Sequence, residues 1–103
     1  MRATMGGYVY ILLCRDSRYY VGTTRTSLEQ RVAEHNAGTY DGWTARRRPV
    51  ELMYAEWFER VEDSIAAERQ IKRWSRAKKE ALIRGDFERL SALSVSAYRR
   101  GDS

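Results

Sequence analysis

The sequence predicts one small α+β domain, a three-stranded antiparallel sheet flanked by helices in the order β-β-α-β-α-α. Two short runs rich in aromatic and β-branched residues follow each other closely near the N-terminus, which is typical of a β-hairpin. A third run of this kind comes after one helical pattern, and the remainder is mostly helical. The 103 residues suffice for one domain and are too few for two.

The hairpin is expected to join strands at residues 8–14 and 18–24. Successive side chains of a strand point to opposite faces of the sheet. With a three-residue loop, Tyr10 lies opposite Gly22, Tyr10 and Tyr20 share one face, and the apolar side chains collect on the other face. A two-residue loop would separate the two tyrosines and mix polar groups into the core. The hydrophobic pattern therefore favours the three-residue loop.

Two positions of this hairpin have special requirements. The loop contains no glycine, so Asp16 or Ser17 must adopt a left-handed backbone conformation. Gly22 leaves space beside the ring of Tyr10 and lets a ligand approach the backbone. Two phenols beside a gap predict a polar pocket, although an aromatic-rich, half-exposed strand is the alternative interpretation of these two runs alone.

The next elements are marked by helix signals. Ser27 followed by Gln30 has the spacing of a capping box, and Thr26 with Glu29 offers the same spacing one residue earlier, so a helix is expected to begin here. Gly38 supplies its end. Residues 39–49 form a loop rich in arginine, and residues 51–58 are the expected third strand.

The C-terminal part of the chain is expected to be helical. A long helical pattern runs from about residue 61 to 83, with an expected bend near Ser75, and a short helix follows at about residues 87–93. We therefore expect a compact domain at residues 1–84. Residues 85–103 would form a short C-terminal helix and a basic tail.

The charge balance indicates the class of partner. The net charge is +5, and sixteen of the nineteen basic residues are arginines. The planar guanidinium suits phosphate oxygens, so DNA is the leading partner class, and a merely basic surface is the alternative. A single cysteine, Cys14, fits a reducing cytoplasm. No signal peptide is visible, and no apolar run reaches the roughly 20 residues of a membrane helix, so we expect a cytoplasmic protein without a membrane partner.

Two helical pairs are candidates for a site. Residues four apart share a helix face, so Arg31 and His35 can point together toward the two phenols. Glu68 and Lys72 share a face in the same way, with Glu68 at the edge of a buried stripe. A half-buried carboxylate needs a partner. That partner is either a divalent cation with its waters, or Lys72 or an arginine.

These residues resemble the signature of a known family. Residues 8–10 (YVY) and 20–22 (YVG), with ten residues from phenol to phenol, resemble the paired tripeptides that name the GIY-YIG endonucleases. Arg31 followed by His35 resembles the helix signature of this family, and Glu68 resembles its glutamate motif. Four elements in the right order make the resemblance specific.

The resemblance covers about residues 7–84. The stretch ERQIKRWSRAKKEALI is similar to a bacterial subgroup of small proteins that consist of this domain alone. Two residues depart from the pattern. Tyr8 stands where the family name has glycine, and Thr23 stands where many members carry lysine, which removes one candidate for phosphate contact.

The resemblance implies a DNA endonuclease that depends on Mg²⁺ or Mn²⁺. It implies Tyr10 as general base, Arg31 on the phosphate and Glu68 as the metal ligand. Tyr20 would donate a hydrogen bond to the phenolate or the phosphate, and His35 would contact the phosphate or orient the base. A free tyrosine has a pKa near ~10, so a neighbouring positive charge must favour its phenolate.

Further basic side chains are candidates for contact with the DNA backbone. With Arg31 they are Arg46, Arg47, Arg48, Lys72 and Arg76. The arginine run and the helix face could equally be solvated charges. Two other functions stay open: a non-catalytic nucleic-acid-binding module, or a nuclease subunit with a protein partner that supplies DNA specificity.

Overall fold

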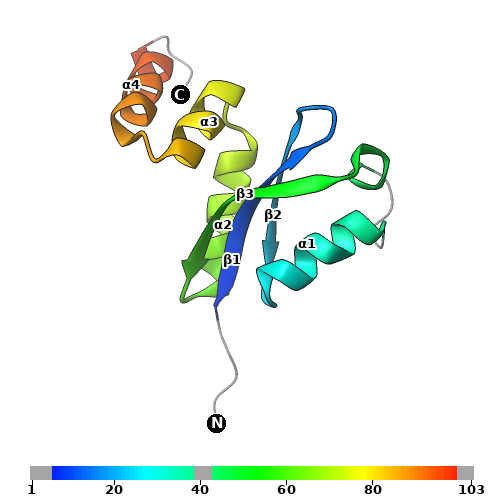
Figure 1. The fold of residues 1–103 in the computed structure, drawn as a ribbon. Coiled ribbons are helices and arrows are strands. Elements are labelled where there is room, and N and C mark those ends of the chain that lie inside the picture. The colour runs from blue at the N-terminus through cyan, green and yellow to red at the C-terminus, as the bar shows by residue number, and fades with distance from the viewer. Residues whose placement is uncertain (1–5, 39–42, 100–103) are drawn as a thin grey trace. The chain divides into compact units, whose positions relative to one another are not determined.

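A computed structural model describes the backbone of residues 6–38 and 43–99, and the side chains of this part up to residue 94. Three strands form one antiparallel sheet: β1 (Gly7–Cys14), β2 (Tyr19–Thr24) and β3 (Val50–Phe58). Their order in space is β2-β1-β3, so β1 is central and β2 is an edge strand (Figure 1). The predicted α+β class is confirmed.

The hairpin has the predicted three-residue loop and register. Tyr10 pairs with Gly22, and Leu12 pairs with Tyr20. Ser17 adopts the left-handed conformation that the loop requires, with φ 71°. Tyr10 and Tyr20 therefore lie on the same face of the sheet, with ring centroids 6.3 Å apart.

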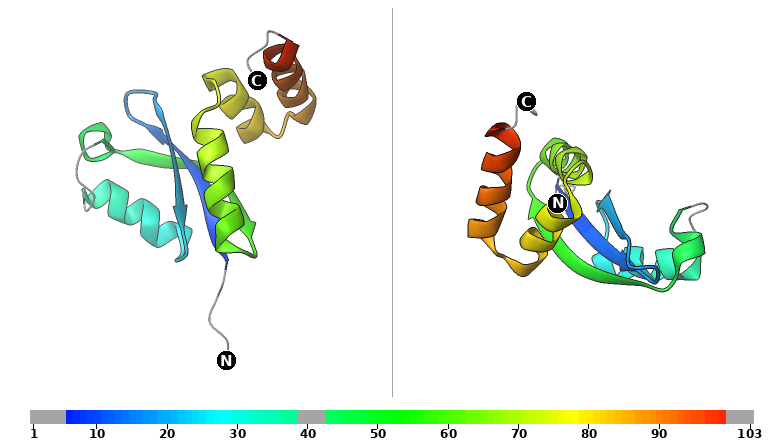
Figure 2. Two further views of the ribbon diagram at one scale, coloured as in Figure 1. Left: turned by 180° about the vertical axis from the view of Figure 1, so that it is seen from behind. Right: turned by 90° about the horizontal axis from the view of Figure 1, so that it is seen from above.

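Helices α1 (Leu28–Ala37) and α2 (Val61–Lys72) cover opposite faces of the sheet (Figure 2). Hydrophobic side chains of α1 pack on the face that carries Tyr10. Ser64 of α2 lies on the other face, where a Cβ on Gly7 would come within 3.0 Å of its hydroxyl. Because both faces are covered, Tyr10 is only 1% exposed. The alternative of a half-exposed aromatic strand therefore does not hold at this tyrosine.

Helix α1 starts after Ser27, one of the two predicted N-caps, and ends at the predicted Gly38. The Ser27 side chain accepts a hydrogen bond from the backbone N–H of Gln30 at 3.0 Å. The Gln30 side chain instead donates a hydrogen bond to Glu34. Ser27 and Gln30 therefore form only half of a capping box. Gly38 ends the helix with φ 77°, a conformation that favours glycine.

The prediction of one long, bent helix at 61–83 was wrong. Helix α2 ends at Lys72, and a separate helix α3 (Arg76–Arg84) begins after Ser75. The Ser75 hydroxyl accepts a hydrogen bond from the backbone N–H of Lys78 at 3.2 Å, which caps a new helix N-terminus. The expected bend is thus a helix boundary.

The last helix, α4 (Phe87–Arg99), is longer than the predicted 87–93. The chain divides into two compact units, residues 1–72 and 73–103. The first unit holds the sheet, α1, α2 and a short 3₁₀ helix, η1 (Ala45–Arg47). It also holds every residue of the cavity described next.

Candidate active site

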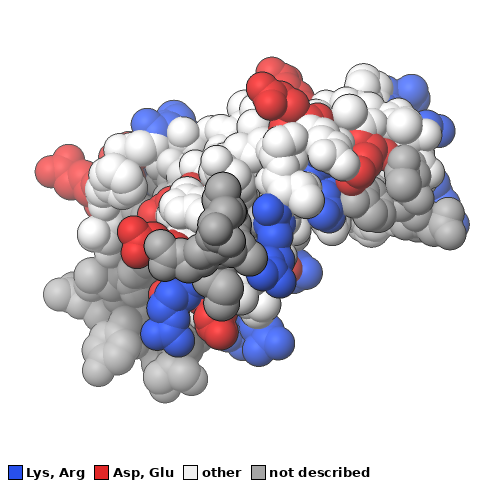
Figure 3. All heavy atoms as spheres, turned by 90° about the horizontal axis from the view of Figure 1, so that it is seen from below, with Lys and Arg blue, Asp and Glu red and all other residues white. Residues whose placement is uncertain are grey.

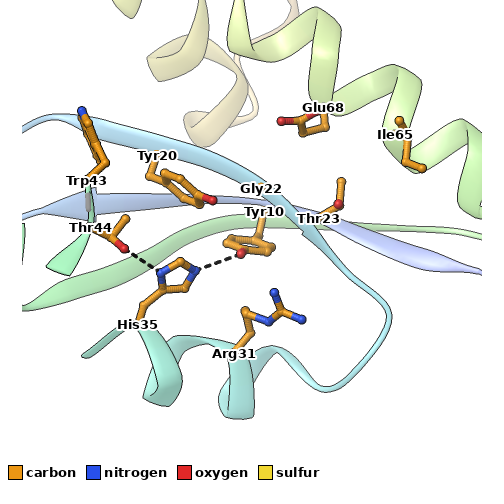
Figure 4. Close-up of a pocket in the computed structure, with 10 residues that line it drawn as sticks. All are labelled: Tyr10, Tyr20, Gly22, Thr23, Arg31, His35, Trp43, Thr44, Ile65 and Glu68. Atoms are coloured by element: carbon orange, nitrogen blue, oxygen red, sulfur yellow. Dashed lines mark hydrogen bonds between the residues drawn. The ribbon is translucent and has the colours of Figure 1, made fainter. Parts of the chain in front are cut away.

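A cavity of about 400 Å³ opens beside the two phenols of the hairpin. Residues from both strands of the hairpin, from α1, from α2 and from the segment before η1 line it (Figure 4). The lining residues are Tyr10, Tyr20, Gly22, Thr23, Arg31, His35, Trp43, Thr44, Ile65 and Glu68. All five side chains that the sequence suggested as catalytic are among them. Thr44 is a polar member of this set that the sequence did not indicate.

A buried chain of two hydrogen bonds joins Tyr10, His35 and Thr44. The Tyr10 hydroxyl lies 3.1 Å from His35 Nε2, and His35 Nδ1 lies 3.0 Å from Thr44 Oγ1. Tyr10 is 1% exposed, and the other two residues are 3% exposed. When Tyr10 donates to Nε2, the imidazole carries its proton on Nδ1 and donates it to the threonine oxygen.

The surroundings of His35 keep its imidazole neutral. Burial lowers the pKa of His35 below its usual value, and the positive charge of Arg31 lowers it further, against a smaller opposing effect of Glu34. At neutral pH the ring therefore has one unprotonated nitrogen, which can take up a proton.

Gly22 provides the space in which the two phenols meet. A Cβ at this position would come within 2.7 Å of the Tyr10 hydroxyl oxygen and 2.9 Å of the Tyr20 ring. No ordinary Cβ contact is that short, so any side chain here must displace a ring. The predicted gap beside Tyr10 is confirmed.

Replacing Gly22 by alanine is expected to destabilise the fold by about 1–3 kcal/mol, the usual cost of overpacking a core. The displaced Tyr10 ring would also give up its hydrogen bond to His35. Chemical denaturation measures the first effect. Thr23→Ala changes the adjacent, partly exposed strand residue and serves as the control. A Gly22→Ala protein as stable as the control would contradict the close packing.

Glu68 approaches the cavity from the opposite side of β2 to Arg31 and His35 (Figure 4). Its carboxylate Oε2 lies 2.7 Å from Lys72 Nζ, one helical turn away. The Glu68 side chain is 15% exposed, whereas that of Lys72 is 60% exposed. The hydrogen bond to Glu68 raises the pKa of the Lys72 ammonium. Lys72 is therefore one partner of the Glu68 carboxylate, as the sequence predicted.

The donors of the cavity fit a cation that keeps most of its waters. Among the described residues, no group of three His, Cys, Asp or Glu side chains could hold a metal. Glu68 provides one carboxylate, and hydroxyl oxygens of Tyr20 and Thr23 belong to the same lining. Mg²⁺ commonly binds through one or two carboxylates plus waters and substrate phosphate. Such an ion at Glu68 would compete with the Lys72 ammonium.

Arg31 and Tyr20 complete the predicted set. The Arg31 side chain is 25% exposed, and its Nε lies 3.5 Å from Glu34 Oε1. The Tyr20 ring packs between two aromatic rings, with centroids 5.2 Å from His35 and 6.1 Å from Trp43. Both side chains line the cavity and thus have access to a ligand there.

The three arginines at 46–48 have different surroundings. Arg47 Nε donates to Asp16 Oδ2 at 2.8 Å, and its guanidinium lies 4.2 Å from the centre of the Trp43 ring. Arg48 Nε donates to the carbonyl oxygen of Ala45 at 2.8 Å. Arg46 is exposed. Two of the three arginines thus stabilise the loop.

Two further predicted DNA contacts lie outside the cavity lining. Lys72 is engaged with Glu68, as described above. Arg76 belongs to the second unit, where its Nε donates to Glu80 Oε2 at 3.0 Å. Their contact with DNA stays a prediction.

The surface charge is mixed. On the face drawn in Figure 3, Lys and Arg side chains lie among Asp and Glu side chains. A basic composition therefore does not translate into a uniformly basic face here. No helix in the described part of the chain is long and apolar enough to cross a membrane.

The comparison with protein families agrees with this geometry. A family model described as "GIY-YIG catalytic domain" matches residues 6–81, most of the chain. The protein belongs to the GIY-YIG family. The match includes both strands of the hairpin, α1 and Glu68.

Relatives of similar length define a subgroup of this family. A UPF0213 protein of Natronomonas pharaonis is 47% identical over 76 residues, which cover 74% of this chain and 88% of the relative. A UPF0213 protein of Streptococcus pneumoniae is 40% identical over 82 residues, covering 80% and 82%. Such relatives occur in archaea as well as bacteria, so the subgroup is broader than the predicted bacterial one.

Solved structures show the same fold. The solution structure of UPF0213 protein BH0048 from Bacillus halodurans has a TM-score of 0.51 at 35% identity, covering 87% of this chain and 98% of that one. Protein EF2693 from E. faecalis has a TM-score of 0.56 at 37% identity, covering 84% and 92%. Neither name states a reaction.

Proposed function

We propose that this GIY-YIG protein is a metal-dependent endonuclease that hydrolyses phosphodiester bonds of DNA, with Tyr10 as general base. The observation that carries the proposal is the buried hydrogen bond between the Tyr10 hydroxyl and Nε2 of a neutral His35. It lies in a cavity that Arg31 and Glu68 also line. The cavity thus combines a base, an acceptor for its proton, a cation for the phosphate and a carboxylate for a metal ion, and together these groups can serve phosphodiester hydrolysis.

The row of hydrogen bonds gives the proton a path. The attacking water loses a proton to the Tyr10 oxygen as its own oxygen bonds to phosphorus. Tyr10 passes its phenolic proton to His35 Nε2, and the imidazolium donates its Nδ1 proton in a hydrogen bond to Thr44 Oγ1. Tyr10 thus accepts one proton and releases one, so it need not be ionised beforehand.

The remaining groups act on the phosphate. Arg31 neutralises charge on the non-bridging oxygens, and Tyr20 donates a hydrogen bond to the same group. Glu68 would hold a Mg²⁺ or Mn²⁺ ion, whose positive charge would stabilise the phosphate and the departing oxygen. When the phosphorus–oxygen bond to the leaving group breaks, that oxygen takes a proton from solvent.

The test is cleavage by the purified protein on branched, single-stranded and duplex DNA, with Mg²⁺ or Mn²⁺ and with EDTA. Metal-dependent cleavage that is lost in active-site variants supports the proposal. Tight DNA binding without cleavage under any of these conditions, with or without cell extract, overturns it. Cleavage that appears only with extract points to a protein partner that supplies DNA specificity.

One observation favours a second function, a non-catalytic nucleic-acid-binding module. Lys72 Nζ forms an ion pair with Glu68 Oε2 at 2.7 Å. A module that has lost its metal would retain such a pair as an ordinary helix contact. The cleavage assay above separates the two functions.

Thr44→Val is expected to lower the cleavage rate by about 10- to 100-fold, since an unsatisfied buried donor costs about 1–3 kcal/mol and each ~1.4 kcal/mol is a factor of ten in rate. Valine keeps the shape of threonine but cannot accept the Nδ1 proton, so the imidazole is less able to accept from Tyr10. We expect kcat to fall while KM is unchanged. Thr44→Ser keeps the hydroxyl and should retain most activity. Equal loss in both variants would assign Thr44 a packing role only.

A further inference from the structure

A second cavity, of about 420 Å³, lies on the arginine-rich side of the same unit. Its lining residues are Arg15, Asn36, Ala45, Arg46, Arg48 and Pro49. Three of the six carry a guanidinium, and none carries a carboxylate. Arginine forks are suited to phosphate oxygens. Among its lining side chains this cavity is therefore positively charged.

Two backbone carbonyl groups fix the position of the Arg48 guanidinium. Its Nε donates to the carbonyl oxygen of Ala45 at 2.8 Å, and its Nη1 lies 3.4 Å from the carbonyl oxygen of Asn36. These contacts involve two of the five N–H donors of a guanidinium. A Cβ on Gly38 would come within 2.7 Å of Nη1, so glycine also makes room for this arrangement.

The neighbouring carboxylate does not neutralise this cavity. Asp16 pairs with Arg47 at 2.8 Å and with Arg18 at 3.7 Å, and neither arginine belongs to the lining. The backbone N–H of Arg15 donates to the carbonyl oxygen of Arg47 at 3.0 Å. This bond fixes the hairpin loop beside η1. The exposed Arg15 and Arg46 side chains thus extend from two segments that are tied together.

The second cavity adjoins the candidate active site. His35 and Thr44 line the first cavity, and the residues that follow them, Asn36 and Ala45, line the second. The two cavities therefore adjoin along the same two segments of the chain. A strand with one phosphate at Arg31 would thus have the second cavity beside it for a further phosphate.

We propose that Arg15, Arg46 and Arg48 form a second phosphate site, which binds the backbone of the DNA strand on one side of the bond to be cut. This inference rests on the proposed function, since it takes the first cavity as the place of the scissile phosphate. The C-terminus of α1 beside the site carries roughly half a negative charge. Three guanidinium groups outweigh it.

The test is DNA binding in EDTA, where no metal-dependent cleavage interferes. Binding of a fluorescein-labelled single strand is followed by anisotropy over a range of KCl concentrations. The double variant Arg15→Gln/Arg46→Gln spares Arg48, which braces the loop. Arg60→Gln/Arg69→Gln removes the same charge from residues outside both cavities and is the control. Melting temperatures show that both proteins are folded.

We expect the slope of log affinity against log salt to fall by about 0.7 for each phosphate that the protein no longer binds, and only in the Arg15/Arg46 variant. Equal slopes in the two double variants, or no DNA binding by the wild type, overturn the second phosphate site. The outcome is independent of cleavage. If the slope falls but the wild type does not cleave DNA, the second phosphate site is supported and the endonuclease activity is rejected. If the wild type cleaves DNA but the slope is unchanged, the activity is supported and the second phosphate site is rejected.

Discussion

Tyr10→Phe is expected to lower the rate of DNA cleavage by the ~10²–10⁴-fold typical of losing a general base. The substitution removes only the hydroxyl, which lies 3.1 Å from His35 Nε2. The ring keeps its packing, so the melting temperature should change little. DNA affinity should also hold, since the contacts with phosphate come from other side chains. Single-turnover rates at saturating protein measure the chemical step apart from binding.

Tyr54→Phe is the matched control for this prediction. Its hydroxyl donates to Glu56 Oε1 at 2.6 Å and lies outside both cavities described here. The loss of a phenol hydroxyl as such should therefore leave cleavage near the wild-type rate. Wild-type cleavage by Tyr10→Phe would remove the general base from the mechanism. It would assign the activity to another site or to a contaminant.

The hairpin could be predicted in detail because a period of two leaves little choice. Only one loop length puts the apolar side chains of both strands on one face, and it also puts Tyr10 and Tyr20 together. The same register explains Gly22, whose missing Cβ makes room for both rings. Ser17 takes the strained position because the chain has no glycine in the loop. Local rules were sufficient here.

Thr44 could not be predicted in this way. It lies in a loop without periodic pattern, and its partner His35 is nine residues earlier, at the end of α1. The packing of that loop against α1 brings the two side chains together. The burial of both, each 3% exposed, exists only in the folded chain. The one local hint is a hydroxyl residue that directly follows a tryptophan, and such a hint is too common to be useful.

The boundary at Ser75 shows a different limit. A helical pattern of apolar residues continues through it, so periodicity alone predicts one helix from 61 to 83. The Ser75 hydroxyl accepts a hydrogen bond from the backbone N–H of Lys78, so it is the N-cap of a separate helix, α3. Capping signals inside a continuous pattern are therefore as informative as the pattern.

Glu68→Gln is expected to lower metal-dependent cleavage by about 10³-fold. A bound metal ion is worth several kcal/mol of transition-state stabilisation, and each ~1.4 kcal/mol is a factor of ten in rate. The amide keeps the size of the side chain but loses the charge that holds a cation. It also frees the Lys72 ammonium, now 2.7 Å from the carboxylate. The positive charge at the site is retained, so DNA affinity in EDTA should not decrease.

Lys72→Gln tests the same pair from the other side. Lys72 competes with the metal for Glu68, so removing its ammonium should lower the Mg²⁺ concentration that gives half-maximal cleavage. The two variants should thus act in opposite directions on metal dependence, although both break the same ion pair. If the pair is an ordinary helix contact, both variants should have the same small effect, near the ~0.3–0.5 kcal/mol of a helical i,i+4 ion pair. Unchanged Mg²⁺ dependence in both variants would therefore remove Glu68 from the metal site and leave it as a helix contact.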